Sequence, residues 1–197
     1  MAIRTISQIR SALMSCFKEI GMRRNERFWS DEDQYNCFVE AMGREPNASE
    51  MFPPVELGGQ CQSGELGTAA CDLMIELIRK NTSEHAAQVY DRESRGHIFY
   101  YIDSMTRGIY NHMIKKGEDA VPFKVIRANV ICTMAHERRH EVQPASMLDM
   151  TPVDGIGTEQ YCALRHESDA DDFMLAVING QADINNPAAW EPERLVA

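Results

Sequence analysis

Hydrophobic residues near the start of the chain recur at three- and four-residue steps. The positions are Ile3, Ile6, Ile9, Leu13, Phe17 and Ile20. This spacing places them on one face of a helix. Ser30, which is followed by three acidic residues, is typical of the start of a second helix, and Gly43 is typical of its end. The pattern therefore predicts two packed helices before residue 44.

The periodicity is lost between Arg44 and Leu66, where three prolines and three glycines occur. A loop of this length is either functional or loosely ordered. We expect a connecting loop, and a lid is the alternative. Thr68 then predicts the cap of a short helix that continues to about Lys80.

The hydrophobic pattern changes between Ala87 and Asp103. The run "AQVYD" is followed by a polar "RESRG" and then by "HIFYYID", which is rich in aromatic and β-branched residues. Two such runs joined by a polar turn are typical of a hairpin. The sequence therefore predicts a small antiparallel sheet whose main strand extends from His97 to Asp103.

Three further helices are predicted from apolar periodicity and from end signals. They are 104–116, capped by Ser104 and closed by Gly117; 122–143, opened by Pro122 and stopped by Pro144; and 164–181, ended by Asn179 and Gly180. Together these elements predict an α+β fold that is mainly α. With 197 residues, of which 44% are hydrophobic, the chain is expected to form a single domain, 1–197.

Composition narrows the possible partners and the location. Thirty acidic residues against 20 basic ones give a formal charge of -10, so neither nucleic acid nor a membrane is expected as a partner. The first residues lack the apolar core of a signal peptide, and no run approaches the ~20 apolar residues of a membrane span. The six cysteines form no C-x-x-C pair, which favours reduced thiols. The expectation is a soluble, cytoplasmic protein.

The helix 122–143 contains "TMAHERRHEVQ", in which His136, Glu137 and His140 have the spacing H-E-x-x-H. Apolar residues on two sides of this helix predict that it is buried. Between them lies a polar stripe of Asn129, Thr133, His136, His140 and Gln143. Two histidines at i and i+4 can bind one metal ion, and Glu137 would flank that ion. On an exposed helix the same residues would be only a charged run.

A catalytic zinc ion commonly has three protein ligands, and the third is sought in the helix 164–181. On its helical wheel, Glu167 and Asp171 lie within the apolar arc, whereas Asp169, Asp172 and Arg165 lie on the opposite side, which is expected to face solvent. A carboxylate in a core needs a charged partner or a metal. Glu167 is therefore the predicted third ligand, and Asp171 is predicted to hydrogen-bond a ligand histidine. The alternative is a helix face that borders solvent.

These motifs resemble those of zincin metallopeptidases of the gluzincin type, whose third ligand is a glutamate in an E-x-x-A-D helix. "AHERRHEVQ" and "RHESDADDF" are most similar to uncharacterised metallopeptidase-like proteins of bacteria and phages with H-E-x-R-H-x-x-Q and E-x-D-A-D helices. The resemblance implies Zn²⁺ bound by His136, His140 and Glu167, with Glu137 as general base. No residue of the chain is a secure counterpart of the Tyr or His that often stabilises the oxyanion in such enzymes.

The resemblance also implies an architecture for the chain. The region 85–180 would form a minimal zincin core of an active-site helix, a glutamate helix and the small antiparallel sheet. The helical region 1–80, with its loop at 44–66, would be an addition before the core, and 181–197 would be a C-terminal tail. The strand that begins at His97 would either bind a peptide by strand addition or only cover the core.

The implied function is that of a zinc metallopeptidase, which hydrolyses a protein or peptide substrate through a zinc-bound water that Glu137 activates. Two other classes remain open. One is a non-catalytic binding or regulatory module that zinc stabilises. The other is a deformylase-like amidase, in which Cys61 would be the third ligand. The oligomeric state does not follow from these patterns.

Overall fold

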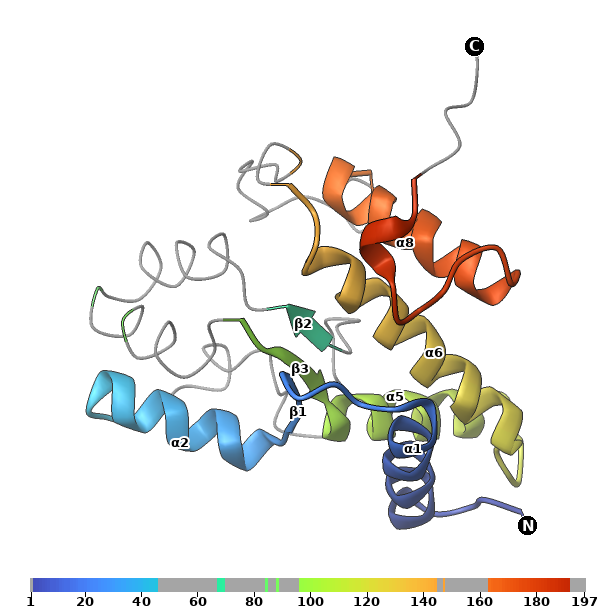
Figure 1. The fold of residues 1–197 in the computed structure, drawn as a ribbon. Coiled ribbons are helices and arrows are strands. Elements are labelled where there is room, and N and C mark those ends of the chain that lie inside the picture. Colours follow the sequence, from blue (N-terminus) through green and yellow to red (C-terminus); the bar gives the residue numbers. More distant parts are fainter. Residues whose placement is uncertain are drawn as a thin grey trace. The chain divides into compact units, whose positions relative to one another are not determined.

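The structure is a computed structural model that describes residues 2–45, 67–69, 84, 88, 96–144, 147 and 163–191 (Figure 1). The chain forms two compact units, Met1–Val130 and Ile131–Ala197. The part that the structure describes is mainly helical, as expected from the sequence. That the chain is a single domain stays a prediction. Most of the predicted loop 44–66 and the predicted helix up to Lys80 lie outside the described residues.

Two helices in the first unit form as predicted, because each has a local start signal. Helix α1 (Ile6–Ile20) begins with a capping box in which the side chain of Thr5 accepts from the backbone N–H of Gln8. Helix α2 (Asp31–Met42) begins with the same arrangement between Ser30 and Asp33 and ends at Gly43, whose φ is 65°. Helix α1 buries its apolar face and packs against α5 (Ile102–Lys115).

The sheet of the first unit has three strands in the order β1-β3-β2. Strands β1 (Glu26–Trp29) and β3 (Ile98–Tyr101) run parallel, and β2 (Gly67–Ala69) runs antiparallel to β3. The connection from β1 to β3 is long and includes α2, as a parallel pair requires. All four residues of β3 are buried, as expected for a central strand covered on both faces.

The predicted antiparallel hairpin is therefore wrong. Strand β3 forms near the expected place, but Gln88 from the other predicted strand is helical, and the pairing partners of β3 come from β1 and β2. Thr68, predicted to cap a helix, lies in β2. Since β3 is paired along both edges, it has no free edge to which a peptide strand could add. Sequence periodicity identifies a strand but not a partner that is some 30 to 70 residues away.

Helix α5 begins two residues earlier than predicted, directly after β3, so Ser104 lies inside the helix and does not cap it. Asp103 in its first turn accepts hydrogen bonds from Arg10 of α1 and from the backbone N–H of Asp31 in α2, both at 3.2 Å. Arg107 then donates to Asp31 at 2.6 Å. These contacts fix the first turn of α5 against both preceding helices.

The second unit contains the end of α6 (Phe123–His140), α8 (Arg165–Ile178) and the short 3-10 helix η3 (Pro187–Ala189) (Figure 1). Helix α6 ends three residues before the predicted Gln143. Pro144 disfavours helical backbone at the residue before it, so the chain turns at 141–142. Helix α8 ends at Asn179 and Gly180 as predicted.

Burial along α6 differs between its two halves. Phe123 and Val125 near its start are 44% and 37% exposed, so the prediction of a helix buried on both sides is wrong there. From Thr133 to Arg139, by contrast, every residue except His136 is buried. No helix in the described ranges combines the length and apolarity that a membrane crossing requires.

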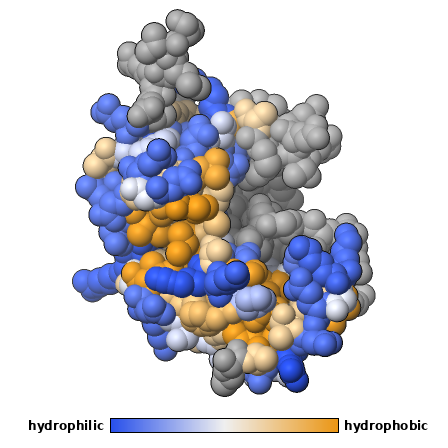
Figure 2. Space-filling view, turned by 90° about the vertical axis from the view of Figure 1, so that its right-hand side faces the viewer, coloured by the Kyte–Doolittle hydropathy of each residue, from blue (hydrophilic) through white to orange (hydrophobic). Residues whose placement is uncertain are grey.

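Some apolar side chains remain on the surface of each unit. In the second unit these are Leu175 and Ile178 of α8, which are about half exposed. Figure 2 shows one face of the molecule, on which hydrophobic residues gather in areas bordered by hydrophilic ones. Nothing in the described part of the chain shows what would cover such residues, and single exposed apolar side chains are ordinary.

Candidate metal centre

Three side chains converge between α6 and α8. His136 and His140 lie one turn apart on α6, and Glu167 lies in the first turn of α8. Their ligand atoms all lie within 4.8 Å of one another, so the group can hold a metal ion. The Nε2 of His136 is 2.9 Å from the Nε2 of His140 and 3.2 Å from Glu167 Oε2. The structure thus brings together the three residues that the sequence predicts as ligands.

The spacing of these atoms fits a small tetrahedral cation. Ligand atoms that bind zinc at about 2.0–2.1 Å in tetrahedral geometry stand about 3.3 Å apart. The observed separations are 2.9, 3.2 and 3.6 Å, the last between His140 Nε2 and Glu167 Oε1. Two imidazoles and one carboxylate suit zinc, and imidazole also binds other first-row metals. The geometry of the group is therefore compatible with a bound metal ion, and metal analysis would identify the ion.

The charges of the group would favour a bound cation. Burial alone would raise the pKa of Glu167, but hydrogen bonds from His136 and His140 hold it well below its usual range. Burial likewise opposes the charged form of His136, yet the hydrogen bond to Glu167 and the nearby charges of Glu137, Glu167 and Asp171 raise its pKa to about 9. Protons are therefore drawn to the imidazoles, and a divalent cation would satisfy the same negative charge.

Asp171 lies one turn beyond Glu167 on α8 and supports the first histidine. Its Oδ1 is 3.0 Å from the Nδ1 of His136. A hydrogen bond at Nδ1 leaves the other ring nitrogen, which faces Glu167, for a metal. Asp171 therefore lies where the sequence predicts a supporting residue.

The position of Asp169 shows that the predicted orientation of α8 is wrong on one side. This residue was expected to face solvent, yet it is 8% exposed and binds Arg139 through two hydrogen bonds of 2.7 and 3.1 Å. Arg139 continues to the backbone oxygen of Pro187 at 2.7 Å, and its guanidinium lies over the ring of Trp190. The helical wheel misses this pair because a second face of α8 is covered by the later segment 187–190.

The second arginine of the motif is also buried. Arg138 has no exposed surface and donates to Asn185 Oδ1 at 3.0 Å and to the backbone oxygen of Ile184 at 3.5 Å. The residues that could be taken for a charged surface run are thus interior groups. Ile184 and Asn185, which belong to the predicted C-terminal tail, therefore contact α6.

Glu137, the predicted general base, is 7% exposed and follows the first histidine on α6. Burial lowers the pKa of His140, whereas the hydrogen bond to Glu167 and the charge of Glu137 raise it, with a net rise. The carboxylate of Glu137 therefore acts on both rings. His166, which is also buried, has its Nε2 3.4 Å from Glu167 Oε1.

The comparisons with known proteins add no relative. No family model, curated protein or solved structure matches this chain. Cys61, the third ligand of the deformylase-like alternative, lies outside the residues that the structure describes.

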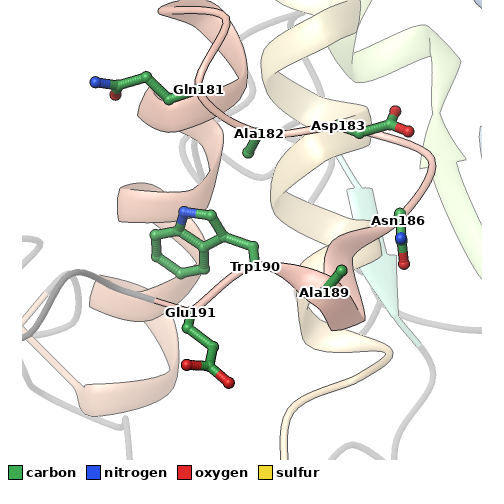
Figure 3. Close-up of a pocket in the computed structure, with 7 residues that line it drawn as sticks. All are labelled: Gln181, Ala182, Asp183, Asn186, Ala189, Trp190 and Glu191. Atoms are coloured by element: carbon green, nitrogen blue, oxygen red, sulfur yellow. The ribbon is translucent and has the colours of Figure 1, made fainter.

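A surface pocket of about 420 Å³ lies near the end of the second unit (Figure 3). Its lining residues are Gln181, Ala182, Asp183, Asn186, Ala189, Trp190 and Glu191. Figure 3 shows the ring of Trp190 turned towards α8, where it meets Phe173 at a centroid distance of 5.5 Å. None of the three converging metal-site residues lines this pocket, so it does not bear on their chemistry.

Proposed function

We propose that this protein is a zinc-dependent peptidase in which His136, His140 and Glu167 bind the metal and Glu137 is the general base. The observation that carries the proposal is the convergence of two imidazole nitrogens and one carboxylate at 2.9–3.6 Å. The buried carboxylate of Glu137 beside this group supports the assignment of a base. The zincin-like arrangement of α6 and α8 belongs to the same proposal.

The type of each residue determines its role in the proposed reaction. Zinc in this site would polarise the scissile carbonyl and lower the pKa of a water molecule towards about 7. Glu137 takes the proton of the attacking water and passes it to the leaving amine. Asp171 keeps His136 oriented through its Nδ1. Burial of Glu167 and Glu137 keeps their charges poorly screened, which strengthens both roles.

The non-catalytic alternative makes a different prediction about the metal. A structural zinc ion normally has four protein ligands, whereas a catalytic one keeps a position open. Among the described residues the group contains three ligands. Metal analysis with a measurement of coordination number would distinguish the two proposals.

The decisive variant is Glu137→Gln, which keeps the size of the side chain and removes the base. We expect it to fold, to retain zinc, and to lose activity by at least the ~10²–10⁴-fold typical of general-base removal. Because the substrate is unknown, new protein termini would be compared in cells that express the wild type or the variant. Cleavage by both proteins, or by neither while zinc is bound, would refute the peptidase.

A further inference from the structure

The side-chain amide of Gln143 has an orientation that chemistry fixes. Its Nε2 lies 2.6 Å from the backbone oxygen of His166 and 2.8 Å from Asp169 Oδ2. An amide nitrogen has two hydrogens to donate, and both of these oxygens only accept. Rotation of the amide by half a turn would place its own oxygen against two acceptors. Nε2 must therefore face His166 and Asp169, and Oε1 must face the other way.

That other direction leads to the second ligand histidine. Gln143 Oε1 is 2.8 Å from His140 Nδ1. Since an amide oxygen only accepts, Nδ1 must carry the hydrogen. In a neutral ring the lone pair then lies on Nε2, which is 2.9 Å from His136 Nε2 and 3.6 Å from Glu167 Oε1. Gln143 thus determines which nitrogen of His140 faces the metal group.

Asp169 is in turn held from the opposite side. Its Oδ2 accepts from Arg139 Nε at 2.7 Å as well as from Gln143, and its Oδ1 accepts from a second nitrogen of the same guanidinium at 3.1 Å. Arg139 and Asp169 are 7% and 8% exposed, so the pair is kept from water. A carboxylate fixed by two bonds is a rigid acceptor for the amide of Gln143.

We propose that Gln143 is a positioning residue of the metal site. Asp169 and the backbone oxygen of His166 hold its side chain, so that His140 keeps the Nδ1–H tautomer and presents Nε2 to the ion. The proposal rests on the metal site of the proposed function and is independent of peptide hydrolysis. Gln143 completes a symmetric support, because Asp171 occupies the corresponding place at His136. The two ligand histidines are thus oriented from two different segments, α8 and the residues that follow α6.

The tautomer can be read directly from the imidazole nitrogens of the ¹⁵N-labelled full chain by long-range ¹H–¹⁵N NMR. The wild type is expected to show His140 with hydrogen on Nδ1, both with zinc bound and without metal at a pH where the ring is neutral. Gln143→Met keeps a similar length and removes the acceptor. It should lower zinc affinity by about 10–100-fold, as is typical when a group that orients a ligand is lost. It should also admit the other tautomer in the metal-free ring.

Gln181→Met is the matched control, because it makes the same chemical change at an exposed position of the same unit. Gln181→Met should leave both the zinc affinity and the tautomer of His140 unchanged. Hydrogen on Nε2 of His140 in the wild type, zinc bound through Nδ1, or a Gln143→Met protein with wild-type zinc affinity would each overturn the proposal. If Gln143→Met does not fold, the wild-type spectrum alone decides. Wild-type protein that binds zinc without cleaving peptides would refute only the peptidase, and Gln143 would keep its role.

Discussion

At the scale of residues, the site is a set of buried charges with specific partners. Glu167 is 7% exposed, and burying a carboxylate is costly unless other groups compensate its charge. His136 and His140 are those groups on one side, and His166 approaches on another. Without a metal, protons on the imidazoles compensate the charge of Glu167, and a metal would replace those protons.

Removal of Glu167 should affect metal binding far more than removal of a nearby surface acid. Glu167→Ala takes away one of three ligands, so zinc affinity should fall by more than the ~10–100-fold that loss of an orienting group produces. Asp172→Ala, an exposed position on the same helix, should leave affinity nearly unchanged. Competition with a chromophoric chelator measures both. Equal losses in the two variants would show that Glu167 is not a ligand.

The sequence was sufficient to predict that three residues converge and that Asp171 contacts His136, but not the other contacts around them. His136, His140, Glu167 and Asp171 could be chosen because positions on one helix have fixed directions relative to one another. Asp169 was placed in solvent because its burial depends on groups from two other segments, α6 and 187–190. Gln143 was seen in the polar stripe without a role, since two of its partners, His166 and Asp169, come from α8.

At the scale of elements, features that depend on neighbouring residues were predictable, and pairings between distant segments were not. The start of α2 and the ends of α2 and α8 depend on signals within a few residues, and these were predicted correctly. The strand order β1-β3-β2 depends on contacts across most of the first unit, so the expected hairpin failed. The same limit applies to α8, whose rotation is set by what covers it.

The pair Asp169–Arg139 joins α8 to α6 and should matter for stability. Asp169→Ala would leave a buried guanidinium without its carboxylate, and breaking a buried pair in this way typically costs about 3–5 kcal/mol. The free energy of unfolding from denaturant titration should fall accordingly, and zinc affinity should fall with it because Gln143 loses an acceptor. Asp172→Ala is again the control. A loss below about 1 kcal/mol would mean that the pair does not hold the helices together.

At the scale of the whole molecule, the site links stability to pH and to metal. A group whose pKa is higher in the folded than in the unfolded state favours folding when it is protonated. The pKa of His136 is raised from 6.5 to about 9, so its contribution is fully present below about 6.5 and is lost as pH rises through about 9. Zinc needs the neutral imidazole, so its binding has the opposite dependence on pH.

The metal-free protein should therefore lose stability between pH 6.5 and 9, while the stabilisation that zinc adds should grow over the same window. Thermal or denaturant unfolding with and without zinc, at fixed zinc concentration and ionic strength, measures both trends. His136→Gln should weaken the pH dependence of both the metal-free stability and the zinc-dependent stabilisation, because it removes the group that exchanges its proton for the metal. His112→Gln, at an exposed histidine of α5, should leave both unchanged. If the zinc-dependent stabilisation is the same at pH 6.5 and at pH 9, then His136 does not bind the ion as a neutral imidazole, and the ligand set proposed here is incorrect.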